Sequence, residues 1–188
     1  PLGGSASPVR LHPALAPASD VALLSARIDP SAASVVFAAD LLQDDVLELF
    51  AAPIDGSAAP ILLGGPFVAG GDLWTQPTLG AWQALEIAPV GGHVVYLADQ
   101  DADEVVELYA VPLDGSHPAT KLNRTPVAGG DVKGQPFLRD ETPPPFRIAP
   151  DGRSVLYLAD QDADEALELY LSLIDVERVR RSGSPRDP

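Results

Sequence analysis

Short apolar runs ending at an aspartate recur three times along this 188-residue chain. They read VVFAAD (residues 35–40), VVYLAD (94–99) and VLYLAD (155–160). Short runs rich in β-branched and aromatic residues, bounded by turn residues, are typical of strands. Pro and Gly interrupt every long apolar window, which argues against helices. The pattern therefore predicts an all-β chain.

These runs belong to a longer unit that the chain uses three times. Each run leads into an acidic stretch and then into ELF or ELY, and the first two copies close with a Pro-Ile/Leu-Asp-Gly-Ser turn. The copies span approximately residues 21–63, 80–123 and 144–175. The stretches after the first two copies, FVAGGDLWTQPTL and PVAGGDVKGQPFL, also match each other. Such self-similarity indicates a repeat architecture.

Each copy predicts four strands in series, and four antiparallel strands per repeat describe a propeller blade. We therefore expect β-propeller-type blades, about three in number, in an open arc or a fragment of a larger propeller, since closed rings need about four to eight. One domain is expected over residues 1–175, followed by a flexible tail over 176–188 that is basic and rich in Pro and Ser. Residues 1–12 match the last strand of the unit, so they correspond to the last strand of a preceding or a final blade.

The segment IAPDGRSVLYLADQDADEALELY (residues 148–170) resembles the repeat of TolB-like β-propellers, a WD-repeat-like blade family also seen in propeller domains of prolyl-oligopeptidase-type peptidases. The resemblance covers nearly all of residues 1–175, although only the third copy keeps Pro150-Asp151-Gly152. It implies a non-enzymatic binding or scaffold module that presents its loop face to a protein or carbohydrate partner, in a periplasmic or extracellular setting. Two alternatives stay open: a substrate-gating propeller of a peptidase or hydrolase whose catalytic domain lies outside this chain, and a calcium-stabilised adhesion module.

Charge and missing motifs narrow the function classes. The net charge of −15 argues against nucleic acid and anionic membrane surfaces as partners, since both attract clustered Lys and Arg. No apolar run reaches the length of a membrane span, so no membrane insertion is expected. The sequence has no Cys and no Gly-x-Ser-x-Gly motif, and its three His occupy unrelated repeat positions. We therefore predict that the chain is not an enzyme.

Two nearly identical acidic segments carry the chemistry that repeats. ADQDADEVVELY (residues 98–109) and ADQDADEALELY (159–170) place acids at alternate positions, with a Glu eight residues after the first Asp. Oxygen ligands at this spacing suit Ca²⁺, and the arrangement is similar to the calcium loops of integrin-type propellers. The candidate ligands are Asp99, Asp101, Asp103, Glu107, Asp160, Asp162, Asp164 and Glu168.

Two departures favour a different interpretation of these segments. Glu104 and Glu165 occupy the position where a sharp turn prefers Gly, and Leu42 replaces the second acid in the first copy. The alternative to calcium is a solvated turn whose acids cap backbone N–H groups and keep the sheet edge soluble. Both interpretations stay open at the level of sequence.

Strand direction places the acidic loops and the long connectors between copies on one face. If successive strands alternate in direction, both kinds of segment lie at the same end of the strands. The connectors carry Trp74, Trp82, Phe137 and Phe146. Exposed aromatic rings beside charge suit a polypeptide or carbohydrate partner, so these four are the candidate partner-binding residues. The alternative is that the rings pack onto the protein itself.

Overall fold

The computed structural model describes residues 7–17, 19–74, 85–90, 92–132 and 145–174. Within these ranges the chain forms eleven strands and no helix, so the prediction of an all-β chain is confirmed. The described residues therefore contain no helix that is long and apolar enough to cross a membrane.

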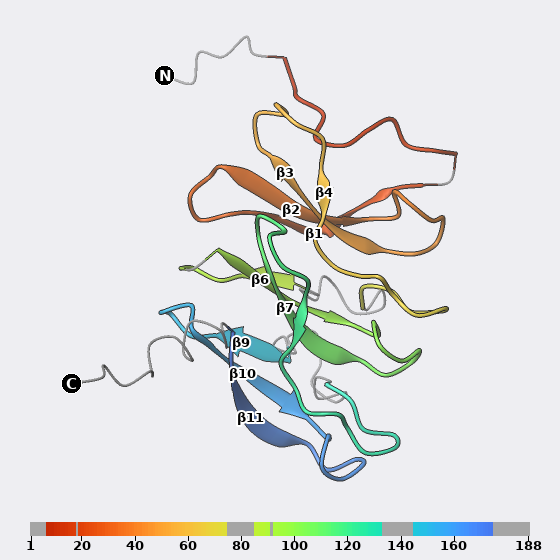
Figure 1. The fold of residues 1–188 in the computed structure, drawn as a ribbon, viewed down its shortest axis with the longest axis vertical. Coiled ribbons are helices and arrows are strands. Elements are labelled where there is room, and N and C mark those ends of the chain that lie inside the picture. Colours follow the sequence, from red (N-terminus) through yellow and green to blue (C-terminus); the bar gives the residue numbers. More distant parts are fainter. Residues whose placement is uncertain (1–6, 18, 75–84, 91, 133–144, 175–188) are drawn as a thin grey trace, which may run out of the picture.

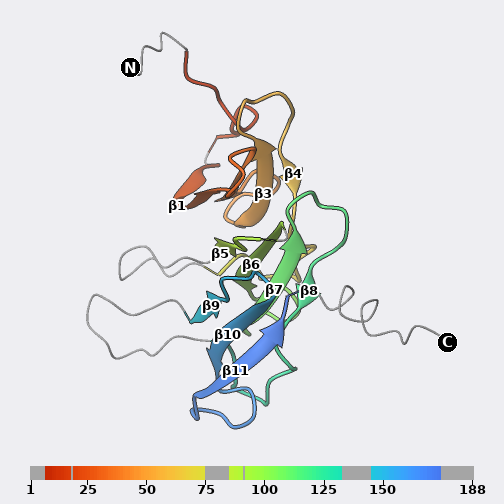
Figure 2. The same ribbon diagram turned by 90° about the vertical axis from the view of Figure 1, so that its left-hand side faces the viewer.

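The strands form three antiparallel sheets in chain order, each strand pairing with the next. Sheet 1 contains β1 (Val21–Ile28), β2 (Ser34–Ala39), β3 (Glu48–Pro53) and β4 (Ile61–Leu62). Sheet 2 contains β5 (Leu85–Ile87), β6 (His93–Ala98), β7 (Glu107–Pro112) and β8 (Thr120–Lys121). Sheet 3 contains β9 (Phe146–Ile148), β10 (Ser154–Ala159) and β11 (Glu168–Leu173). The three sheets follow one another along the molecule, with sheet 2 in the middle (Figures 1 and 2).

The central hairpin of each sheet has the same register. The last residue of the first strand pairs with the Glu that opens the second, as in Ala98↔Glu107 and Ala159↔Glu168. One aromatic pair faces across each hairpin: Phe37–Phe50, Tyr96–Tyr109 and Tyr157–Tyr170, with ring centroids 5.8, 5.5 and 5.5 Å apart. Such cross-strand aromatic pairs fix register and stabilise a sheet. The sequence repeat is thus a structural repeat.

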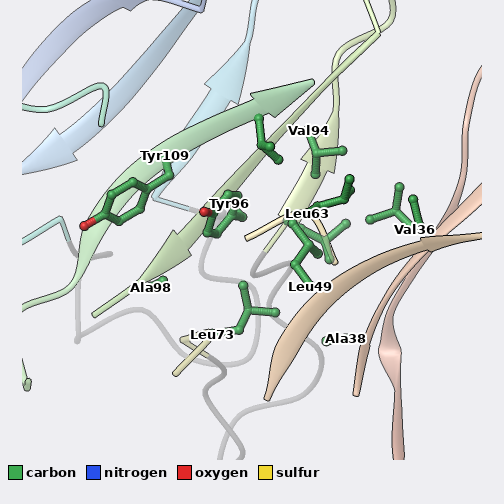
Figure 3. Close-up of a cluster of buried hydrophobic side chains, with 12 residues drawn as sticks. Val36, Ala38, Leu49, Leu63, Leu73, Val94, Tyr96, Ala98 and Tyr109 are labelled. Carbon is green, nitrogen blue, oxygen red and sulfur yellow. The ribbon is translucent and has the colours of Figure 1, made fainter. Parts of the chain in front are cut away.

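Apolar side chains that alternate along the strands form a core between each pair of neighbouring sheets. Between sheets 1 and 2, Val36 and Leu49 from one side meet Val94 and Tyr96 from the other (Figure 3). Sheets 2 and 3 are joined in the same way by residues that include Leu108 and Tyr157. The inner strands of sheets 1 and 2 bury both of their faces, so their residues form near-continuous apolar runs, as the sequence shows.

The N-terminal segment covers the outer face of sheet 1. Leu11 packs with Phe37 and Phe50 in a third apolar cluster, and Val9 packs against Gly56. Residues 1–12 were expected to correspond to the last strand of a preceding or a final blade; their described part, residues 7–12, contains no strand. The predicted tail at 176–188 and the last strand of the third copy lie outside the described residues.

Candidate functional site

The three acidic loops share one backbone conformation. They join the central strands of each hairpin, at residues 40–47, 99–106 and 160–167. The sixth residue of each loop, which is Asp45, Glu104 or Glu165, has a φ of 61°. This left-handed conformation is the one that normally favours Gly. The turn therefore keeps its shape although an acid stands at the glycine position.

The first aspartate of each loop ties that loop to the connector that precedes its sheet. In sheet 2, Asp99 Oδ1 accepts the Asp72 N–H at 2.6 Å, while the Asp72 carbonyl accepts the Asp99 N–H at 3.3 Å. The other carboxylate oxygen, Oδ2, accepts the Glu104 N–H within the loop at 3.2 Å. We call this two-way pairing of a loop aspartate with a connector aspartate the aspartate latch.

The aspartate latch occurs in all three sheets. In sheet 3, Asp160 Oδ1 accepts the Asp131 N–H at 2.7 Å, and the Asp131 carbonyl accepts the Asp160 N–H at 3.1 Å. In sheet 1, the Asp40 carboxylate accepts a hydrogen bond from the Asp20 N–H, and the Asp20 carbonyl accepts one from the Asp40 N–H. Asp40 and Asp160 are buried. A carboxylate that accepts backbone N–H groups in this way acts as a cap, because it provides a hydrogen-bond acceptor for N–H groups that would otherwise lack one.

A glycine pair lets each connector lie directly against the acidic loop. A Cβ at Gly70 would come within 2.7 Å of Asp103 Oδ2, and one at Gly71 within 2.5 Å of the Asp99 carbonyl oxygen. Gly129 stands in the same relation to the Asp164 carboxylate, at 2.8 Å. These contacts place the acidic loops and the described parts of the connectors together, as strand direction predicts.

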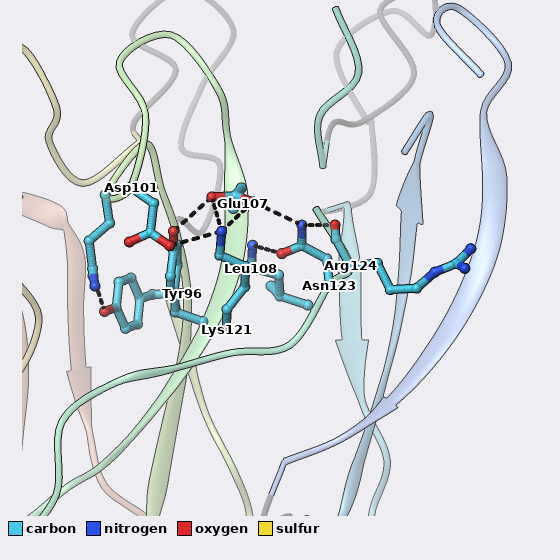
Figure 4. A network of polar contacts seen from close by, with 9 residues as sticks. Tyr96, Asp101, Glu107, Leu108, Lys121, Asn123 and Arg124 are labelled. Atoms are coloured by element: carbon cyan, nitrogen blue, oxygen red, sulfur yellow. Dashed lines mark hydrogen bonds and ion pairs between the residues drawn. The ribbon is translucent and has the colours of Figure 1, made fainter. Parts of the chain in front are cut away.

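In sheet 2, one acid of the loop and the Glu that opens β7 contact a lysine from the last strand (Figure 4). The Lys121 ammonium lies 2.8 Å from Asp101 and 2.7 Å from Glu107, and the Tyr109 hydroxyl donates to Glu107 at 3.0 Å. Glu107 is only 2% exposed. Burial by itself would lower the pKa of Lys121, but the hydrogen bonds that its ammonium donates to the two carboxylates, together with their negative charges, outweigh burial and raise that pKa. The lysine thus neutralises a buried acid, a role that sequence analysis missed.

In sheet 3, the equivalent of Asp101 has a different partner. Both Asp162 oxygens lie 2.6 Å from the Arg124 guanidinium, which comes from the segment after β8. The Tyr170 hydroxyl donates to Glu168 at 2.7 Å, and both acids are exposed. Arg124 therefore links the end of sheet 2 to the loop of sheet 3.

Sheet 1 replaces the ion pair with apolar residues. Leu42 stands where sheet 2 has Asp101, and Leu62 is the register equivalent of Lys121. Glu48 keeps the position of Glu107, but its Oε2 is buried without a hydrogen-bond partner. Burial raises the pKa of Glu48 as a result. Between the two four-stranded sheets, Lys121 and Asp101 of sheet 2 are therefore replaced together, by Leu62 and Leu42 of sheet 1.

The connector aspartate of sheet 2 lies in the negative field of its own loop. Burial, followed by the charges of Asp99, Asp103 and Glu104, raises the pKa of Asp72 from 3.8 to about 6. Both effects disfavour the negative charge, so the ionised form of Asp72 costs stability at neutral pH.

Several of the candidate calcium ligands already have partners within the protein. Asp99 and Asp160 already accept backbone N–H groups, and Glu107 is paired with Lys121. In the part of the chain that the structure describes, no group of three or more His, Asp or Glu side chains is placed to hold a metal ion. Calcium binding stays a prediction from the sequence, and the contacts give it no support.

The aromatic candidates divide between core and undescribed segments. Phe146 is 2% exposed and belongs to the core between sheets 2 and 3, so its ring does not face a partner. Trp74 is half-buried against the same core, and its backbone N–H donates to the Leu97 carbonyl at 3.0 Å. Trp82 and Phe137 lie outside the described residues.

Comparisons with known proteins add nothing to the identity of the chain. No protein-family model matches the sequence, and the search of curated proteins found no match. The resemblance to TolB-like repeats therefore remains an expectation from the residues themselves.

Proposed function

We propose that the chain is a non-enzymatic binding or scaffold module of β-propeller type, resembling TolB-like repeats, which presents its acidic loops to a protein partner. Successive antiparallel sheets of three and four strands, packed through apolar cores, support this assignment. The observation that carries it is the aspartate latch, which fixes every loop to a connector at the same end of the strands. A surface held in this way is preorganised, so binding it costs little ordering entropy.

The exposed acids of the loops define the surface that we call the acidic face. They are Asp44, Asp45, Asp101, Asp103, Glu104, Asp162, Asp164 and Glu165. Clustered carboxylates on a fixed scaffold attract Lys and Arg side chains and raise the rate of association with a basic partner. Charge thus favours a protein with a basic surface over a neutral carbohydrate.

A fluorescent lysine- and arginine-rich peptide provides the test. Glu104→Gln combined with Glu165→Gln removes two charges from the acidic face and keeps the backbone N–H bonds that both residues donate inside their loops. We expect the dissociation constant for the peptide, measured by fluorescence anisotropy at low salt, to rise about fivefold, because an exposed ion pair contributes on the order of 0.5 kcal/mol.

A matched pair of substitutions provides the control. Asp55→Asn with Asp114→Asn removes the same charge from the Asp-Gly turns, which lie at the opposite end of the strands, and Asn can still accept the Ser57 and Ser116 N–H bonds. The control should change binding less than twofold. If both pairs of substitutions weaken peptide binding equally, the peptide responds to the overall charge of the protein, and the acidic face is not a specific binding surface.

A further inference from the structure

Sheet 3 exposes an apolar face on the side turned away from sheet 2. Leu156, Leu169, Leu171 and Leu173 are 42%, 67%, 65% and 40% exposed. Leu156 and Leu171 are direct partners in the register of β10 and β11, so their side chains lie next to each other on one face. Sheet 3 is the last sheet of the row in both views, and no described residue covers this face (Figures 1 and 2).

The equivalent faces of the other two sheets are interfaces. Leu49 and Ala51 of sheet 1 pack against sheet 2, and Leu108 and Ala110 of sheet 2 pack against sheet 3. All four are at most 4% exposed. The leucine face of sheet 3 therefore continues, by position, an interface that the chain forms twice.

The side chains of this face differ in size from those of the inner interfaces. Leu171 stands where sheets 1 and 2 have Ala51 and Ala110, and Leu156 stands where they have Val36 and Val95. The small residues of the inner interfaces belong to the same apolar clusters as aromatic rings of the next sheet, such as Phe146. Larger leucines in these positions would overpack against such rings, whereas they can interdigitate with other leucines.

At the other end of the row, the described residues leave the corresponding face of sheet 1 covered. Phe37 and Phe50 on the outer face of sheet 1 are 4% and 3% exposed, because the chain's own residues, including Leu11 and Leu41, pack over them. A second copy could not dock head to tail without displacing this cover. A self-complementary patch that meets its own copy across a two-fold axis forms the commonest type of closed oligomer.

We propose that the leucine face of sheet 3 binds the same face of a second copy of this chain, sheet against sheet. The resulting dimer would have both of its ends covered by N-terminal segments. This inference is independent of the acidic face, which lies on the loop ends of the strands, so either proposal can fail while the other stands.

Analytical ultracentrifugation of the full chain tests the association. Between about 5 and about 500 µM, a range suited to an interface of modest area, we expect a monomer–dimer equilibrium without larger species. Leu169→Ser with Leu171→Ser should weaken dimerisation at least about tenfold, since the two most exposed leucines leave the interface. Leu42→Ser, which changes an equally exposed leucine in the loop of sheet 1, should leave it unchanged. Circular dichroism confirms that each variant is folded.

Cross-linking through single introduced cysteines distinguishes face-to-face from head-to-tail association. The natural sequence contains no Cys that would interfere. Leu171→Cys should form a disulfide-linked homodimer under mild oxidation. Ser7→Cys, at the opposite end, should not, and a mixture of the two variants should give no cross-linked heterodimer. A chain that stays monomeric at every concentration would overturn the proposal. Cross-links between Ser7→Cys and Leu171→Cys would overturn it as well, because they would show head-to-tail assembly.

Discussion

Residues 98–109 and 159–170 are identical at ten of twelve positions, yet they have different surroundings. Their loop halves match: Asp99 and Asp160 form the same latch and bond the same N–H inside the loop. Their strand halves diverge, since Leu108 is fully buried while Leu169 is 67% exposed. The loop conformation therefore depends on the loop and its connector, whereas burial of the strand depends on the neighbouring sheet.

We expect the largest difference in stability between equivalent substitutions in strands β7 and β11. Leu108→Ala should lower the free energy of unfolding by about 2–5 kcal/mol, because it leaves a cavity between sheets 2 and 3. Leu169→Ala should cost no more than about 0.5 kcal/mol, as is usual for an exposed site. Chemical denaturation at concentrations where the chain is monomeric measures both values. Similar losses at the two positions would contradict the difference in burial.

The ion pair of sheet 2 gives a second contrast. Lys121→Met removes the cation beside a buried acid, and we expect a loss of about 2 kcal/mol, below the usual range for fully buried pairs because the lysine is partly exposed. Adding Glu107→Gln should recover part of that loss. Glu168→Gln in sheet 3, where the acid is exposed, should change stability by less than about 0.5 kcal/mol. A Lys121→Met variant as stable as the natural protein would show that the pair contributes nothing.

The ionisation of Asp72 in the connector of sheet 2 should make the stability of the protein depend on pH. Its pKa is raised from 3.8 to about 6 in the folded protein, so the folded state binds its proton more tightly than the unfolded state does. The cost of ionisation is therefore present above about pH 6 and disappears as the pH falls towards 4. Asp72→Asn should stabilise the protein by about 1 kcal/mol at pH 7, a value reduced for solvent screening because the group is half-exposed. This gain should vanish near pH 4 when the two unfolding curves are compared, and a constant gain at both pH values would exclude the electrostatic explanation.

Calcium should have the smallest effect. A cation that binds only the folded state raises its stability once its concentration exceeds the dissociation constant. Because Asp99 and Asp160 already accept backbone N–H groups, and Asp101 and Glu107 are paired with Lys121, we expect the melting temperature to be the same in about 2 mM Ca²⁺ and in EGTA. An increase abolished by Asp101→Ala with Asp162→Ala would restore the calcium-stabilised alternative.

The sequence predicts the strands and the repeat well because both depend on local patterns. The first aspartate of each acidic loop directly follows a strand, as the apolar runs of the sequence predict, and the repeated tyrosines pair across their hairpins in the same register. Partners distant in the chain are harder to predict. Nothing local connects Lys121 to Glu107, and Phe146 looks like a loop residue until the short strand β9 places it in a core. A matched loss of charge at Leu42 and Leu62 was the one available signal for the ion pair.

Amide hydrogen exchange tests the aspartate latch most directly, and the latch is what makes the acidic face a fixed surface. The N–H groups of Asp72 and Asp131 each donate to a loop carboxylate, so we predict slow exchange for both. In Asp160→Ala, the Asp131 amide should lose its protection while the Asp72 amide keeps it. If both amides exchange in the natural protein as fast as in an unstructured peptide, the loops are not latched to the connectors and the account is wrong.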